Sequence, residues 1–234
     1  MENSIVKIEK LVKRFPVGKA EFTALKDISV NFGTGEFTGL VGPSGSGKTT
    51  LLNIIGSLDT PSGGEVTVLG KSTSSLSHKE SATLRNHHIG FIFQTYNLLP
   101  VYTVYENVEF ALLLQRMSGS ERKKAVMDAL EWVGLTDKAK SRPSMLSGGE
   151  CQRVAIARSM VKRPEIVLAD EPTANLDSAN SHHILQTMKN LNRELKTTFL
   201  FATHDEKVMK YLDRIISLED GKIVKDMILT NSKN

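Results

Sequence analysis

The residues best suited to chemistry lie in one glycine-rich run, GPSGSGKTT, that begins at Gly42. The run satisfies the pattern G-x-x-x-x-G-K-[ST], which predicts a phosphate-binding loop when a strand precedes it and a helix follows. Its backbone N–H groups would surround phosphate oxygens, Lys48 would reach the β- and γ-phosphates, and the Thr49 hydroxyl would hold Mg²⁺. The predicted nucleotide contacts are Gly42, Pro43, Ser44, Gly45, Ser46, Gly47, Lys48, Thr49 and Thr50.

Two adjacent carboxylates, Asp170 and Glu171, follow the apolar run Ile166 to Ala169. In open α/β sheets, ligands gather beyond the carboxyl ends of the strands. Asp170 is therefore predicted to help position a metal ion, and Glu171 to activate an attacking water as a general base. A solvated strand end would have the same sequence, so this pair alone does not decide between the two interpretations.

The elements that must position these residues show in the hydrophobic pattern. Alternation at Val6 and Ile8, and again from Ile28 to Phe32, predicts antiparallel strands at the start of the chain. Phe37 to Val41 reads as a buried strand that runs into the glycine-rich loop, and apolar residues at helical spacing follow from Leu51. The serine-rich stretch from Lys71 to Ser77 reads as a loop.

The second half of the chain changes from a helical to a strand pattern. From about Thr103 to Val161 the apolar residues follow helical spacing, which predicts a helical insert. Strand, helix and strand then alternate through Ile184 to Leu195 and Thr198 to Ala202, as in a covered parallel sheet. Asp220-Gly221 predicts a hairpin, and the tail after Thr230 is expected to be frayed.

Composition limits the class of protein. With 234 residues, 40% hydrophobic and 24% charged, the chain is expected to be one soluble globular domain. It has no apolar run of roughly 20 residues that could cross a bilayer, and the N-terminus lacks a secretory pattern, so we expect it in the cytosol. A single cysteine excludes an internal disulfide framework. The net charge of +4 is compatible with anionic partners but is weak support for any one of them.

A third motif narrows the class. Leu146-Ser147-Gly148-Gly149-Glu150, followed by a predicted helix, resembles the signature of ABC (ATP-binding cassette) ATPases. The resemblance implies an α/β fold: a P-loop NTPase core with a parallel sheet, an N-terminal antiparallel β subdomain and an inserted helical subdomain. The core would comprise residues 1–94 and 164–234, and the helical subdomain residues 95–163.

The same resemblance assigns further residues in the expected order along the chain. Gln94 would sense Mg²⁺ and the attacking water, Asp177 would belong to the D-loop, and His204 would be the switch histidine. Phe15 would stack on adenine, although Phe22 is an alternative, and either ring could simply belong to the core. Without the other motifs, Gln94 would be read as an ordinary polar residue and His204 as a structural histidine.

The resemblance also implies how the protein works. Ser147, Gly148, Gly149 and Glu150 of one copy would cover the ATP and Mg²⁺ bound by a second copy, in an ATP-dependent homodimer. The motifs are similar to those of the subgroup that serves lipoprotein release and macrolide or peptide export. Integral membrane permease subunits are then the expected partners, and the cytoplasmic face of the cell membrane the expected location. Glu150 and Phe15 depart from the commoner glutamine and tyrosine.

Two rival functions stay open. The chain could be a mechanical regulator that acts through a membrane partner, as in cell division, without transport. It could also be a soluble ABC ATPase that acts on nucleic acid or ribosomes. Such proteins generally carry a second cassette, a coiled-coil insert or a basic linker, and this sequence has none of them. No nucleic-acid partner is therefore expected.

Overall fold

The structure is a computed structural model that describes residues 4–18 and 20–229. An antiparallel sheet is formed by β1 (Ser4–Val17), β2 (Ala20–Gly33), β4 (Gly63–Val68) and β5 (Lys71–Ser72), in the order β2-β1-β4-β5. Its alternating residues Val6 and Ile8 are buried, because every second side chain of a strand faces the same side. The predicted antiparallel opening is confirmed.

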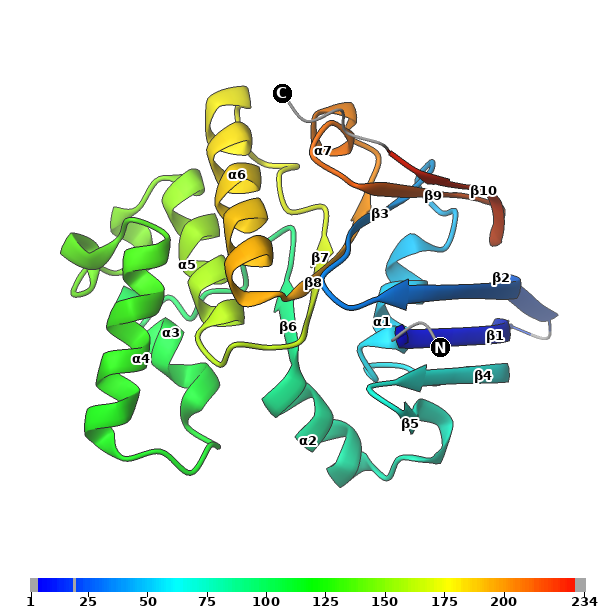
Figure 1. The fold of residues 1–234 in the computed structure, drawn as a ribbon, viewed down its shortest axis with the longest axis horizontal. Helices are drawn as coiled ribbons and strands as arrows, with labels where there is room; N and C mark the ends of the chain where they lie inside the picture. The colour runs from blue at the N-terminus through cyan, green and yellow to red at the C-terminus, as the bar shows by residue number, and fades with distance from the viewer. Residues whose placement is uncertain (1–3, 19, 230–234) are drawn as a thin grey trace.

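A six-stranded sheet lies at the centre of the molecule (Figure 1). It comprises β3 (Phe37–Val41), β6 (Ile89–Ile92), β7 (Ile166–Asp170), β8 (Thr198–Thr203), β9 (Arg214–Glu219) and β10 (Lys222–Ile228). The order is β10-β9-β3-β8-β7-β6, and every neighbouring pair is parallel except β10 and β9. That antiparallel pair is the predicted hairpin at Asp220-Gly221.

Helices cover both faces of the six-stranded sheet. They are α1 (Lys48–Ile55), α2 (His78–His88), α3 (Val104–Glu109), α4 (Gly119–Trp132), α5 (Gly148–Met160), α6 (Ser178–Leu195) and α7 (Glu206–Met209). Short 3₁₀ turns occupy Thr73–Ser75, Phe110–Leu112, Thr136–Lys138 and Pro143–Met145. None of the described helices is long and apolar enough to span a membrane.

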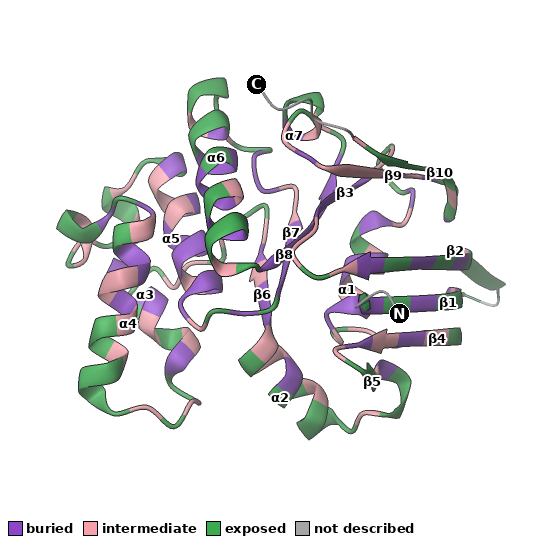
Figure 2. Ribbon diagram, in the orientation of Figure 1, coloured by how far each residue is buried: buried purple, intermediate pink, exposed green. Residues whose placement is uncertain are grey.

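Two hydrophobic cores hold these layers together (Figure 2). One joins α1 and the antiparallel sheet to one face of the central sheet, through residues such as Leu40 and Leu200. The other joins α3 to α6 to the opposite face, through Phe37 and Phe201. Strands β3, β7 and β8 are buried almost throughout because both of their faces are covered.

The predicted fold class is confirmed, with local differences. The stretch from Lys71 to Ser77 is not simply a loop: it contains β5 and a 3₁₀ turn, and Ser77 is the N-cap of α2. Helix α2 and strands β4 and β6 were not predicted from the pattern. Helices α3, α4 and α5 lie between β6 and β7, whereas the boundaries drawn at residues 94/95 and 163/164 stay a prediction. The tail expected to fray after Thr230 lies outside the described residues.

Candidate nucleotide-binding site

The glycine-rich loop joins β3 to α1 and leaves the start of α1 open. The N-cap Gly47 has φ 105°, and no side chain caps this helix end. A Cβ at Gly47 would lie 2.7 Å from Leu25 Cδ2 and 3.0 Å from the Ala24 carbonyl oxygen, so only glycine fits. The first N–H groups of α1 are therefore available to an anion, which the helix dipole also favours.

Lys48, the first residue of α1, is held against the loop. Its Nζ donates hydrogen bonds to the carbonyl oxygens of Gly42 at 2.7 Å and Pro43 at 2.8 Å. Burial lowers the pKa of Lys48, while the negative charges of Glu171 and Asp170 act in the opposite direction. The ammonium group is thus placed beside two carboxylates, at the loop where phosphates would bind.

Thr49 and Asp170 form a set of oxygen ligands. The Thr49 hydroxyl lies 3.1 Å from Oδ1 and 3.0 Å from Oδ2 of Asp170. Burial raises the pKa of Asp170, and the hydrogen bond from Thr49 partly offsets that rise. Hydroxyl and carboxylate oxygens at this spacing are the hard ligands that Mg²⁺ prefers, so these two residues fit the predicted metal.

Glu171 follows β7 with an unusual backbone. Its φ is 46°, in the left-handed region that costs a residue with a Cβ about 1 kcal/mol or more, and its N–H donates to the Ala202 carbonyl oxygen at 2.9 Å. The side chain is only 16% exposed. Its Oε1 lies 2.6 Å from His204 Nδ1, and its Oε2 accepts a hydrogen bond from the Thr203 hydroxyl at 3.1 Å. Backbone and side chain together fix the direction of this carboxylate.

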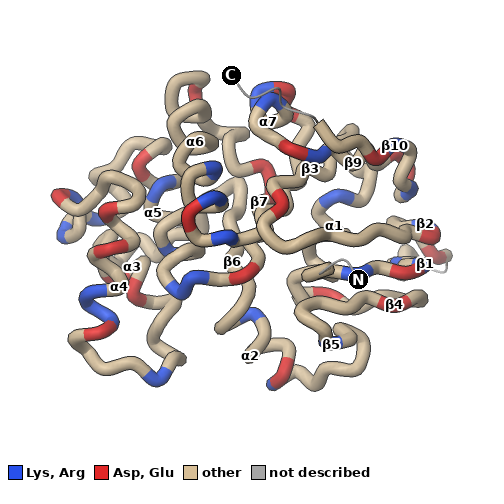
Figure 3. Tube along the Cα trace, in the orientation of Figure 1, with Lys and Arg blue, Asp and Glu red and all other residues tan. Residues whose placement is uncertain are grey.

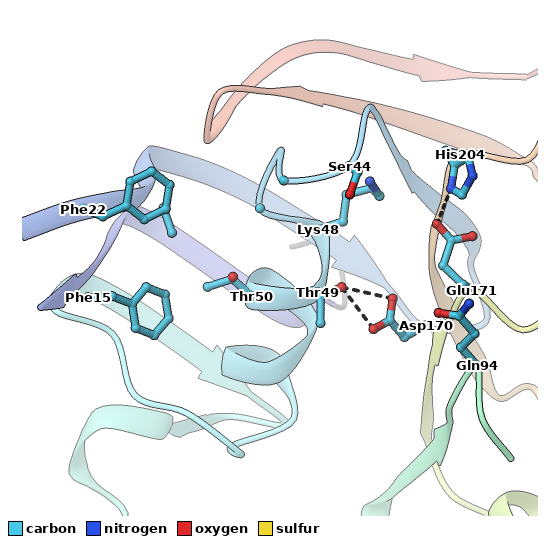
Figure 4. A pocket seen from close by; sticks show the side chains of 13 residues that line it. Phe15, Phe22, Ser44, Lys48, Thr49, Thr50, Gln94, Asp170, Glu171 and His204 are labelled. Carbon is cyan, nitrogen blue, oxygen red and sulfur yellow. Dashed lines mark hydrogen bonds and ion pairs between the residues drawn. The ribbon is translucent and has the colours of Figure 1, made fainter. Parts of the chain in front are cut away.

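These residues line a single cavity of about 450 Å³ (Figure 4). The structure brings together most of the predicted site residues in this cavity: Phe15, Ser44, Gly45, Gly47, Lys48, Thr49, Thr50, Gln94, Asp170, Glu171 and His204. Phe22 and Ala24 also line it. Phe22 was predicted only as an alternative to Phe15, and Ala24 was not predicted, because a small apolar residue in a strand gives no chemical signal.

The signature residues Ser147 to Glu150 and the D-loop residue Asp177 are not among the residues that line this cavity. Ser147 caps α5: its hydroxyl accepts a hydrogen bond from Glu150 N at 3.2 Å, and Glu150 Oε2 accepts one from Ser147 N at 2.7 Å. Asp177 caps α6 by accepting from Asn180 N at 2.8 Å. A Cβ at Gly149 would lie 2.5 Å from Asn180 Oδ1, so the starts of α5 and α6 touch. These residues form a second polar surface, separate from the cavity.

Comparison with known proteins shows the family to which the chain belongs. Residues 25–174 match the family described as ABC transporter. The macrolide export ATP-binding/permease protein MacB of two Burkholderia pseudomallei strains is 42% identical over 228 residues, which cover 97% of this chain and 35% of MacB. The chain therefore spans about a third of the length of these curated relatives.

Two solved structures are similar over nearly the whole chain. The ATP-binding cassette MJ0796, a dimer bound to ADP and Pi, has a TM-score of 0.89 and 42% identity, and the match covers 97% of this chain and 99% of that one. CbiO1 from Clostridium perfringens, part of the ABC transporter complex cbiONQ, has a TM-score of 0.87 and 31% identity, over 96% and 88% of the two chains. The chain therefore belongs to the ABC transporter family and is an ATPase of its cassette type.

Proposed function

We propose that two copies of this ATPase close head to tail over two ATP molecules and thereby drive integral membrane permease subunits. One observation carries the proposal: the cavity holds the phosphate-binding loop and both carboxylates, whereas Ser147 to Glu150 lie outside it. A second copy can place its own Ser147 surface over the open side of the cavity. The solved dimer of MJ0796 supports this assembly.

Within the cavity the residues have distinct tasks. The N–H groups of the loop and the Lys48 ammonium bind the phosphates, and Glu171 takes the proton from the water that attacks the γ-phosphorus. His204 and Thr203 hold the Glu171 carboxylate in position for that transfer. Thr49 and Asp170, with Gln94 nearby, would hold Mg²⁺, which neutralises phosphate charge when bound.

An exposed apolar surface after Gln94 supports a membrane partner. It comprises Val101, Tyr102, Phe110, Leu113 and Leu114, of which Leu114 is 83% exposed. Apolar side chains gathered in one short segment commonly mark a protein interface. We place the cytoplasmic helix of a permease here, over the segment from Thr95 to Glu109 and the turn that follows it. The chain would then act at the cytoplasmic face of the membrane.

We propose that the assembly exports or extracts a lipoprotein, a peptide or a drug, and the similarity to MacB supports this proposal. A nucleic-acid partner has no comparable support, because basic and acidic residues are interspersed along the chain trace in Figure 3.

Site-directed cross-linking tests the partner surface. Tyr102 is the better probe because it is exposed, whereas the Tyr96 hydroxyl is tucked against Gly148. A Tyr102→Cys chain lacking Cys151 should cross-link to a copurified membrane protein. A matched Lys71→Cys chain, whose cysteine would lie on β5 in the antiparallel sheet, should not. Reaction at position 71 alone, or failure to recover any membrane protein, would contradict the docking proposal.

A further inference from the structure

The backbone just after Gln94 makes an unusual turn. Tyr96 has φ 56° and Asn97 has φ 49°, so two successive residues with a Cβ lie in the left-handed region. Asn97 N donates to the Thr95 carbonyl oxygen at 2.6 Å, which closes a very tight bend. Asparagine tolerates this conformation but tyrosine does so poorly, hence surrounding contacts must stabilise the bend.

Arg158 supplies contacts at that bend from helix α5. Its Nη1 donates to the Asn97 carbonyl oxygen at 2.5 Å, and its Nη2 donates to the Tyr96 carbonyl oxygen at 2.6 Å. The planar guanidinium group therefore holds both residues of the bend at once. Burial lowers the pKa of Arg158, and no carboxylate in the described part of the chain pairs with it. The Arg158 cation is partly removed from water, and the carbonyl oxygens of Tyr96 and Asn97 are its hydrogen-bond acceptors. The low local polarity strengthens each of these hydrogen bonds.

Two further contacts hold the segment from Gln94 to Tyr96. The Tyr96 hydroxyl oxygen would lie 3.1 Å from a Cβ on Gly148, at the start of α5. Asn175, just before the start of α6, donates from Nδ2 to the Gln94 carbonyl oxygen at 3.0 Å. The segment from Gln94 to Asn97 is therefore held by both ends of α5 and by Asn175.

The other end of this segment reaches the cavity. Gln94 lines the cavity, and Figure 4 shows its side chain beside Asp170 and below Glu171. We propose that Arg158 is a positioning residue for ATP hydrolysis: by fixing the bend at Tyr96 and Asn97, it sets the place of Gln94 at the carboxylates. The inference rests on the proposed role of Gln94 at Mg²⁺ and water.

The substitution Arg158→Lys tests this role because it keeps the charge but loses the fork that spans two carbonyls. A displaced Gln94 should lower kcat by about tenfold and raise the Mg²⁺ concentration for half-maximal rate, since small misplacements near reacting groups have large effects. Affinity for ATP, measured in the full chain without Mg²⁺, should stay at the wild-type value. A lysine that simply weakened the fold would change the amount of active protein, not the Mg²⁺ requirement.

Arg122→Lys is the matched control. Arg122 also donates to a backbone carbonyl oxygen, that of Met117 at 3.1 Å, and lies in the same group of helices, but it does not touch the bend. Arg122→Lys should leave kcat and the Mg²⁺ requirement unchanged, and the unfolding temperature of each variant shows how far its fold is weakened.

The substitution Gln94→Ala distinguishes the positioning role of Arg158 from the proposed role of Gln94 at Mg²⁺ and water. If Gln94→Ala impairs hydrolysis while Arg158→Lys keeps the wild-type kcat and Mg²⁺ requirement, the positioning role is overturned and the role of Gln94 stands. If Gln94→Ala has no effect, the proposed role of Gln94 itself fails. If Arg158→Lys and Arg122→Lys lose activity equally, the Arg158 contact is structural and the inference is wrong.

Discussion

Helices α1 and α5 both begin at functional loops, yet their N-termini are built in opposite ways. The α1 N-cap is Gly47, and no side chain occupies the helix end. The α5 N-cap is Ser147, which forms a capping box with Glu150. Of the seven α-helices in the described part of the chain, α1 alone has no side-chain cap.

The difference shows what each helix end is free to bind. The N–H groups at the start of α1 are open to phosphate from the same chain's nucleotide. At α5, the hydrogen bonds from Ser147 lower the pKa of Glu150, so an ionised carboxylate already lies at this end. We therefore expect an anion to bind directly at the start of α1. The start of α5 can approach a second copy's phosphate mainly through Ser147, Gly148 and Gly149, with Glu150 held by its own helix.

The largest expected effect comes from removing the cation at α1. Lys48→Ala should weaken ATP binding roughly a hundredfold, because hydrogen bonds between charged groups contribute about 1.5–3 kcal/mol each. Isothermal titration with ATP measures the change. Lys79→Ala, at an exposed lysine on α2, is the control and should bind ATP normally. Equal affinities for the two variants would contradict the assignment of the α1 loop as the phosphate site.

A smaller effect should separate the two rings at the adenine end of the cavity. Phe15 and Phe22 are cross-strand partners, so both project from the same face of the hairpin, but Phe22 is 55% exposed. Lys13 Nζ lies 4.9 Å from the centre of the Phe15 ring and helps to fix it. Phe15→Ala should therefore weaken ATP binding more, by about tenfold, a typical value for one aromatic stacking contact. Both variants should bind inorganic triphosphate with the wild-type affinity, because triphosphate has no adenine ring. A larger loss for Phe22→Ala would assign the stacking role to Phe22.

The smallest effect concerns the α5 end. Glu150→Gln keeps the capping box but loses its charge, so ATPase activity should persist and stability at pH 7 should fall slightly. The lowered pKa of Glu150 means that its carboxylate adds stability above the unfolded-state value near 4.5, and that this stability is lost as pH falls through the folded-state pKa. Urea unfolding should therefore distinguish the variant from wild type at pH 7, and the difference should disappear as the pH is lowered through the folded-state pKa of Glu150. A difference that persists in acid would show that the charge is not the cause.

Local motifs made the α1 loop and the carboxylates predictable from sequence. Gly42 to Thr49 and the Asp170-Glu171 pair each lie within one short segment whose flanking pattern fixes the element types. Helix α2 was missed although Ser77 and Glu80 have capping-box spacing, because its mostly polar residues gave no clear helical stripe.

Contacts between distant segments could not be predicted in this way. Arg158 meets the carbonyl oxygen of Tyr96 across 62 positions, and His204 meets Glu171 across 33. Only the folded chain shows which hydrogen bonds these side chains make. The choice between Phe15 and Phe22 stays open for a different reason, because their cross-strand pairing places both rings at one cavity.

Size-exclusion chromatography of Glu171→Gln with and without ATP tests the head-to-tail account most directly. The glutamine keeps the shape of Glu171 but cannot take a proton, so hydrolysis should stop while ATP binding and closure persist. The variant should elute as a dimer in ATP and as a monomer without nucleotide, whereas Lys48→Ala should stay monomeric in both conditions. A Glu171→Gln chain that binds ATP yet remains monomeric, or that hydrolyses ATP at the wild-type rate, would contradict the account.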